Sequence, residues 1–260
     1  MGEQGRAGAK YNPSQELARD MAQLFAGTSG WAYPSWKPDF YPEKLAQKKF
    51  LGFYSTQLNT VEVNFTFRQL VKETTIQNWI QETPTHFRFG VKAHQVITHI
   101  KRLKAMQDFL PRFLATIEPL ASAGKLGPVL FQLPPNLKAD AALLNDFLTL
   151  LPRAVPSAFE FRHESWFTES TWELLRSHNT ALCVAETEER TTPDIVTAPF
   201  VYYRFRKPTY SGEERSAMFA RVHEHLAAGR DVFAYFKHEE TAQGALYAVE
   251  LRREVQQAVA

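Results

Sequence analysis

The sequence predicts an α/β protein with a single TIM-type (β/α)8 barrel. Eight runs of apolar, β-branched and aromatic residues recur along the chain, and helical-period segments lie between them, which is the pattern of βα units on a parallel sheet. The length of 260 residues is typical of such a barrel. No Gly/Ser-rich linker or internal repeat divides the chain. A doubly wound open sheet uses the same local units, so the count of eight carries the prediction.

Each element is expected from its own stretch of sequence. The expected strands are 24–29, 60–64, 86–93, 126–133, 157–162, 181–186, 200–205 and 231–237. The expected helices are 45–57, 74–81, 103–123, 141–150, 170–177, 213–228 and 243–258. The sixth connection, 187–199, is short and lacks this pattern, so we expect an irregular sixth βα unit. Residues 1–22 are expected to form an N-terminal tail or short helix, and residues 23–260 the barrel domain.

The composition limits the kind of protein this is. A hydrophobic fraction of 44% and a net charge of +2 argue for a globular domain without a broad surface for nucleic acid. The single cysteine, Cys183, excludes an internal disulfide and a thiolate zinc site and favours a reducing compartment. No apolar run is long enough for a membrane span or a signal core. We therefore expect a cytoplasmic protein without a membrane partner, and the oligomeric state stays open.

Polar residues in the expected strands share one parity. Side chains alternate faces along a strand, so Val61 and Val63 facing the helices leave Glu62 and Asn64 facing the barrel interior. The same alternation sends inward Arg88, Lys92, Gln132, Glu160, Arg162, Arg204, Tyr235 and Lys237. Most of these residues lie late in their strands, at the carboxyl-terminal mouth where barrel active sites are found. The mouth is therefore the predicted functional site.

Four of these residues are the predicted catalytic set: Glu62, Glu160, Arg162 and His163. Glu62 and Glu160 are expected to handle protons, with Arg162 on the same face holding Glu160 ionised. His163 begins the next loop and titrates near neutrality, so it is the candidate acid. The structural alternative is that Glu160 and Arg162 pair as interior struts and that His163 caps the next helix.

A second set is expected to bind the ligand: Trp31, Asn64, Lys92, Gln132, Trp166, Arg204, Tyr235 and Lys237. The cations give charge-assisted hydrogen bonds to a phosphate or carboxylate, unless they only neutralise the glutamates. Trp31 and Trp166 lie in predicted loops and are expected to stack on the ligand, or else to plug the mouth against helix ends.

No cofactor is predicted, and a divalent metal is the main alternative. Ligands for Mn or Mg would come from Glu62, Glu160 and Glu186 with His163 or His238, although neighbouring cations oppose such an ion. Such a site would fit a metal-dependent sugar isomerase or phosphoesterase. The rival from another class is a non-catalytic protein that binds nucleic acid or another protein through helix 213–228, with Glu213, Arg215, Arg221 and Glu224 on its exposed face.

Several short motifs occur in an order that resembles one known family. They are Gly27-Thr-Ser-Gly-Trp31-Ala-Tyr33, Asn59-Thr-Val-Glu-Val-Asn64, Phe87-Arg-Phe-Gly-Val-Lys92, Leu126-Gly-Pro-Val-Leu-Phe-Gln-Leu-Pro-Pro135 and Phe159-Glu-Phe-Arg-His-Glu-Ser-Trp166. Across about residues 25 to 255 the chain is similar to the YecE-like family, also called domain of unknown function 72 (DUF72). The resemblance implies a TIM-type barrel but no reaction. The chain departs from the family pattern at Phe65, Phe67, Glu186 and Arg206-Lys207.

Together these observations predict an enzyme of unidentified substrate, an isomerase, lyase or hydrolase. It would use acid/base chemistry on a small polar or anionic, sugar- or phosphate-like molecule at the barrel mouth.

Overall fold

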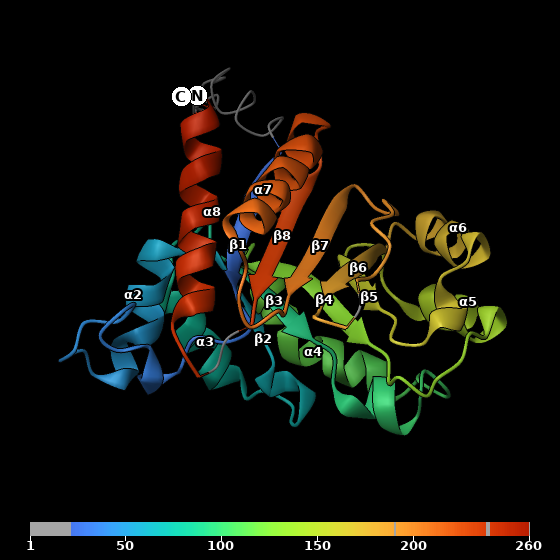
Figure 1. Cartoon of the computed structure of the whole chain (residues 1–260). Coiled ribbons are helices and arrows are strands. Elements are labelled where there is room, and N and C mark those ends of the chain that lie inside the picture. Colours follow the sequence, from blue (N-terminus) through green and yellow to red (C-terminus); the bar gives the residue numbers. More distant parts are fainter. Residues whose placement is uncertain (1–21, 190, 238–239, 260) are drawn as a thin grey trace, which may run out of the picture.

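A computed structural model describes residues 22–189, 191–237 and 240–259. Its eight strands pair in parallel in chain order and close with β1 against β8, as the sequence predicts (Figure 1). The strands are β1 (Leu24–Thr28), β2 (Thr60–Val63), β3 (Arg88–Lys92), β4 (Leu126–Gln132), β5 (Ser157–Glu160), β6 (Ala181–Glu186), β7 (Phe200–Phe205) and β8 (Asp231–Phe236). Residues 1–21 of the predicted tail and His238 lie outside the described residues.

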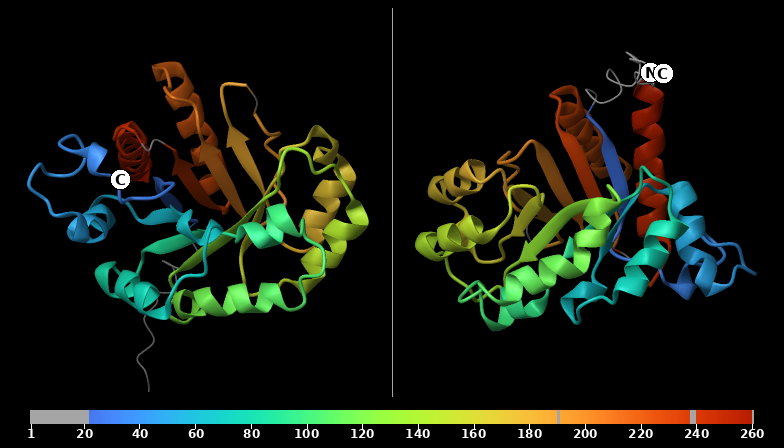
Figure 2. Two further views of the ribbon diagram at one scale, coloured as in Figure 1. Left: turned by 90° about the horizontal axis from the view of Figure 1, so that it is seen from below. Right: turned by 180° about the vertical axis from the view of Figure 1, so that it is seen from behind.

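Helices surround this barrel (Figure 2). The α-helices are α2 (Phe50–Gln57), α3 (Glu73–Glu82), α4 (Phe109–Ser122), α5 (Ala141–Leu150), α6 (Glu169–Ser177), α7 (Gly212–Ala227) and α8 (Gln243–Val259). The shorter turns are η1 (Pro34–Trp36), η2 (Gln47–Lys49), η3 (Phe65–Phe67), η4 (Val96–Ile100) and η5 (Glu164–Trp166). Several of these helices and turns begin with a side-chain cap. At the start of α7, for example, the Ser211 hydroxyl accepts a hydrogen bond from the Glu214 amide, and the Glu214 side chain accepts one from the Ser211 amide. Among the described residues of the sixth connection, 187–189 and 191–199, no helix occurs. No helix in the described part of the chain is both long and apolar enough to cross a membrane.

Strand parity separates two hydrophobic cores. The larger core lies between the barrel and its helices and holds the predicted outward residues, such as Val61, Phe89 and Phe159. A smaller core fills the barrel interior: Phe25, Leu130, Ala158, Ala181, Cys183, Ala198, Phe200, Tyr202, Phe233 and Tyr235. The alternation of polar and apolar side chains therefore assigns these faces correctly.

The interior is apolar toward the amino-terminal ends of the strands. Phe25 and Phe233 stack there with a centroid distance of 4.6 Å, and the Arg88 guanidinium lies 5.8 Å from the Phe25 ring. One layer nearer the mouth, the hydroxyls of Tyr235 and Thr60 are 2.9 Å apart. Gly90 makes room for this tyrosine, because a Cβ at that position would lie 2.5 Å from the Tyr235 oxygen. This layer is the floor on which the charged mouth rests.

The segment after β3 differs most from the prediction. A helix is expected over 103–123, but α4 begins at Phe109, and η4 before it is a single π-helical turn. Arg102, Leu103 and Ala105 have positive φ angles, a conformation that costs free energy in non-glycine residues. Pro111 lies in the first turn of α4, where a proline lacks no intrahelical hydrogen bond, whereas Pro119 lies deeper in the same helix.

Candidate functional site at the barrel mouth

A buried arginine joins two buried glutamates above the apolar floor. Arg204 on β7 donates from Nη2 to Glu62 Oε1 at 2.7 Å and from Nη1 to Glu160 Oε2 at 2.5 Å. The three residues are at most 4% exposed. They come from β2, β5 and β7, so the barrel brings together side chains up to 142 residues apart. We call Glu62, Arg204 and Glu160 the buried triad.

Further hydrogen bonds occupy both carboxylates of the buried triad. The Tyr202 hydroxyl donates to Glu62 Oε2 at 2.7 Å, and Ser29 Oγ donates to Glu62 Oε1 at 2.9 Å. Gln132 Nε2 donates to Glu160 Oε1 at 2.8 Å. Every carboxylate oxygen of the triad therefore accepts at least one hydrogen bond.

These contacts hold both glutamates in the ionised form. Burial alone would raise the pKa of Glu62, but the charge and hydrogen bonds of Arg204, with the Tyr202 hydroxyl, lower it to about 2. The same competition between burial and Arg204 lowers the pKa of Glu160, and the charge of Arg206 contributes. Carboxylates in this state are weak bases, so the geometry does not favour the predicted proton transfer by Glu62 and Glu160.

Two more cations lie above the buried triad, Lys92 at the end of β3 and Arg206 just after β7. Both interact electrostatically with Glu62, Glu160 and Arg204. Burial, and then the charge of Arg204, lowers the pKa of Lys92 to about 8 and also lowers the pKa of Arg206. Around the triad, two carboxylates thus face three cations, which leaves one positive charge in excess while Lys92 is protonated.

The upper cations have unused hydrogen-bonding capacity. Arg206 Nη1 is buried and finds no hydrogen-bond partner among the described residues, and neither does Arg204 Nε. Lys92 Nζ lies 4.4 Å from the centroid of the Phe67 ring. The ring attracts the ammonium group as a cation, but it does not accept conventional hydrogen bonds from the N–H groups of Lys92. Buried donors without partners are rare and costly in a folded protein, and a bound ligand or water is one way to satisfy them.

Two histidines border this part of the mouth in different ways. His99 packs edge-on against Phe67 with a centroid distance of 4.9 Å, and its Nδ1 is 2.8 Å from the Thr98 hydroxyl. Burial and the charges of Lys92, Arg162 and Arg102 lower the pKa of His99. His163 instead caps η5, where its Nδ1 accepts the Ser165 amide at 3.2 Å. The capping alternative weighed for His163 is therefore what the structure shows.

Several predicted site residues lie away from the cation layer. Trp166 is 1% exposed, stacks on Phe161 and donates Nε1 to the Leu137 carbonyl, so it packs beneath the rim. Tyr235 is fully buried in the floor. Trp31 lines a pocket on the rim, as does Asn64, whose Oδ1 is buried without a partner among the described residues.

Arg162 and Lys237 follow their strands at the mouth and are half-buried. Arg162 is the cation that the sequence predicts to hold Glu160 ionised. Glu160 forms its short ion pair with Arg204. The predicted set also omits Arg206 and Ser29, although Arg206 shares the parity of Arg204.

Glu186 does not join the mouth. It lies on the outward parity of β6 and forms ion pairs of 3.3 Å with Lys207 and with Arg221 of α7. Both faces of β6 are apolar, which is why the sequence gives no clear parity there. Arg215 likewise pairs with Glu250 of α8, so two charges of the proposed docking face on α7 contact the protein's own residues.

The donor set does not fit the metal alternative. Arg204 occupies the space between Glu62 and Glu160, and Glu186 points outward. Within residues 22–189, 191–237 and 240–259, no three His, Cys, Asp or Glu side chains are grouped as metal ligands. We therefore derive no chemistry through a metal.

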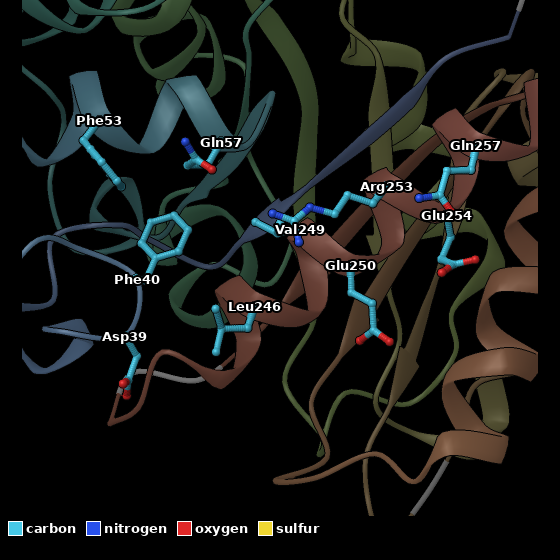
Figure 3. A pocket seen from close by; sticks show the side chains of 10 residues that line it. All are labelled: Asp39, Phe40, Phe53, Gln57, Leu246, Val249, Glu250, Arg253, Glu254 and Gln257. Atoms are coloured by element: carbon cyan, nitrogen blue, oxygen red, sulfur yellow. The ribbon is translucent and has the colours of Figure 1, made fainter. Parts of the chain in front are cut away.

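A groove of about 530 Å³ lies outside the barrel between α2 and α8 (Figure 3). Phe40 and Phe53 line one side, and Leu246 and Val249 the other, with Glu250, Arg253 and Glu254 along α8. It contains no buried ionisable cluster comparable to the triad and its upper cations, so we place the candidate site at the mouth.

Comparisons with known proteins agree with this architecture. The family described as protein of unknown function DUF72 matches residues 25–260. The UPF0759 protein YunF of Bacillus subtilis (strain 168) is 30% identical over 156 residues, which are 58% of this chain and 54% of YunF. The chain thus spans about half the length of the curated relatives that it matches.

Solved structures resemble the barrel as a whole. A crystal structure of a DUF72 family protein from Thermotoga maritima MSB8 is 28% identical with a TM-score of 0.79, covering 90% of this chain and 99% of that one. An AP endonuclease, family 2, from Brucella melitensis is 8% identical with a TM-score of 0.51, covering 84% of this chain and 93% of that one. The second likeness concerns the fold alone.

Proposed function

Because the chain belongs to the DUF72 family of proteins of unknown function, as its motifs predict, we propose its function from the mouth itself. The protein binds a small anionic molecule, sugar- or phosphate-like in size, above the buried triad and carries out acid/base chemistry on it. The observation that carries this proposal is the excess of positive charge around Glu62 and Glu160, together with a buried guanidinium nitrogen of Arg206 that lacks a partner.

The buried triad supports the site without titrating. Glu62 and Glu160 fix the Arg204 guanidinium from two sides, and their low pKa values keep them charged throughout the physiological range. A rigid, already desolvated cation binds an anion without a further ordering cost. The charges of Glu62 and Glu160 also attract Lys92 and Arg206.

Lys92 is the proposed proton carrier. With a pKa of about 8, it is present both as the ammonium and as the free amine near neutral pH, which suits a general acid or base. A bound anion stabilises the ammonium form and so loads the proton, and loss of the anion releases it. Arg206 remains charged and holds the anion through this change.

Calorimetric titration with sulfate, inorganic phosphate and acetate tests the binding. We expect at least one of these anions to bind, and Lys92→Gln and Arg206→Gln to weaken that binding about tenfold or more. Lys101→Gln is the matched control, because Lys101 lies exposed in the same loop region after β3. Failure of all three anions to bind at millimolar concentration, or equal affinity in all variants, contradicts the proposal.

The proton role of Lys92 has its own measurement. Acylation of lysine by acetic anhydride requires the free amine, so the rate at Lys92, followed by mass spectrometry across pH, is expected to have its midpoint near pH 8. Saturating anion should move that midpoint upward. A midpoint above pH 10 in the anion-free protein contradicts the assignment.

A further inference from the structure

A pocket of about 300 Å³ lies on the rim of the mouth, at the carboxyl-terminal ends of β1 and β2. It is bounded by the loop after β1, by η3 and by α3, and its lining residues are Gly30, Trp31, Ala32, Tyr33, Val63, Asn64, Phe65, Thr75 and Trp79. Most of this lining is apolar or aromatic. Its size falls at the lower end of the range for small-molecule sites. We call it the rim pocket.

The aromatic side chains of the rim pocket are arranged as ring contacts. Trp31 meets Trp79 edge to face, with a centroid distance of 5.5 Å and an interplanar angle of 89°. Phe65 borders the same space and is 51% exposed. The walls of the pocket therefore suit a flat, apolar ring.

The turn η3 joins the rim pocket to the cation layer. Phe65 at the start of η3 lines the pocket, and Phe67 at its end lies under Lys92 Nζ. Thr66 Oγ1 between them donates to the Lys92 carbonyl at 2.6 Å, which ties the turn to the end of β3. One short turn therefore presents an apolar ring on one side and a cation–π contact on the other.

One residue of the lining, Asn64, has a polar atom without a partner. Asn64 Oδ1 is buried and accepts no hydrogen bond from the described residues. Asn64 is the last residue before η3, between Glu62 of the buried triad and Phe65 of the pocket wall. A donor on a ligand ring would satisfy this atom, whereas an aliphatic group would leave it unpaired.

We propose that the anion bound at the mouth carries an aromatic ring and that the rim pocket receives this ring. The substrate class is thus an aromatic or heteroaromatic ring joined by a short linker to a phosphate or carboxylate. This inference rests on the proposed function, because the anion anchors the ring. It adds to that function the contacts that would select the ligand, which are those of Phe65, Trp31 and Trp79 with its ring.

The test uses phenylalkyl phosphates with one to four methylene groups, compared with methyl phosphate by calorimetry. At one linker length we expect affinity at least tenfold above that of methyl phosphate, because the ring leaves water for an apolar pocket. The cyclohexyl analogue of that length should bind at least threefold more weakly than the phenyl compound, since it lacks the edge-to-face contact. Equal affinity of methyl phosphate and every phenylalkyl phosphate, or of phenyl and cyclohexyl compounds, overturns the inference.

Variants locate the ring. Phe65→Ser removes a wall and Thr75→Phe fills the pocket, and each should bring the phenyl-to-methyl affinity ratio close to one. Ile100→Ser is the matched control, because Ile100 is an equally apolar rim residue, 64% exposed, outside this lining. A ratio that is unchanged in both pocket variants overturns the inference and leaves anion binding intact. Failure of methyl phosphate and all phenyl compounds to bind instead contradicts the proposed function.

Discussion

The buried triad and the layer above it both contain buried cations, but in opposite situations. In the triad, Arg204 has two carboxylate partners, and the four oxygens of Glu62 and Glu160 all accept hydrogen bonds. In the upper layer, neither Lys92 nor Arg206 forms an ion pair with the described residues; Lys92 rests on a phenyl ring, and Arg206, like Arg204 at Nε, has a buried nitrogen without a partner. Arg204 and Arg206 are only two residues apart, the first on β7 and the second just after it.

The difference separates the structural charges from those available to a ligand. A buried charge that is fully paired contributes to the architecture, and removing its partner is costly. A desolvated charge that lacks a partner lowers stability until a ligand supplies one. Changes in the buried triad are thus expected to alter the stability of the fold, and changes in the upper layer are expected to alter ligand binding.

The largest effect is expected for Arg204→Met. This change leaves Glu62 and Glu160 buried next to each other without their cation, so we expect a loss of about 3–5 kcal/mol or more in the free energy of unfolding. Urea denaturation followed by circular dichroism measures it. Adding Glu62→Gln and Glu160→Gln to the same chain removes the repulsion, and stability should largely return. A loss below about 1 kcal/mol in the single variant would show that the buried triad does not stabilise the fold.

Lys92→Met is expected to increase the free energy of unfolding, whereas Arg204→Met lowers it. The pKa of Lys92 is about 8 in the folded chain, against an ordinary value of 10.5 that applies to the unfolded chain. Between these pH values the folded chain binds fewer protons than the unfolded chain, so the stability of the fold rises with pH there. Below pH 8 the buried ammonium is a net cost, and Lys92→Met should stabilise the protein by about 1–3 kcal/mol. Urea titrations at pH 7 and pH 10 check this, because the gain should shrink at the higher pH. Destabilisation at pH 7 contradicts it.

Strand parity predicts one part of this contrast from the sequence, the face on which a residue lies, and does not predict the layer. Parity places Glu62, Glu160 and Arg204 inside the barrel, because apolar neighbours mark the other face of each strand. It does not tell which inward residues share a layer, since that depends on the register between strands. Parity therefore offers Arg162, two residues along the chain, as a partner for Glu160, and it does not reveal the ion pair of Glu160 with Arg204 of β7.

Two other residues show further limits of sequence reasoning. Glu186 ends a strand that is apolar on both faces, so its outward direction could not be derived. Tyr235 has the inward parity, yet Gly90 opposite it leaves a space that the tyrosine fills below the mouth. Packing of this kind depends on three-dimensional neighbours and is not a property of either strand alone.

A smaller effect is expected on anion affinity as the pH changes. Sulfate keeps its charge from pH 6 to pH 10, whereas Lys92 loses its proton near pH 8. We expect sulfate affinity to fall about three- to tenfold between pH 7 and pH 9, which corresponds to the loss of one cation from the site. Calorimetry at both pH values measures the fall, and Lys92→Gln should bind weakly at both. An equal fall in that variant would assign the titration to another group.

The smallest effect on stability is expected for Phe65→Ser. Phe65 is half-exposed on η3, so its removal opens no closed cavity and should change the free energy of unfolding by no more than about 0.5 kcal/mol. Buried Phe89 is the reference, because Phe89→Ser in the core between barrel and helices should cost several kcal/mol. Thermal and urea unfolding of the two variants compare them directly. A large loss for Phe65→Ser would place this ring among the residues that stabilise the fold, as the buried triad does.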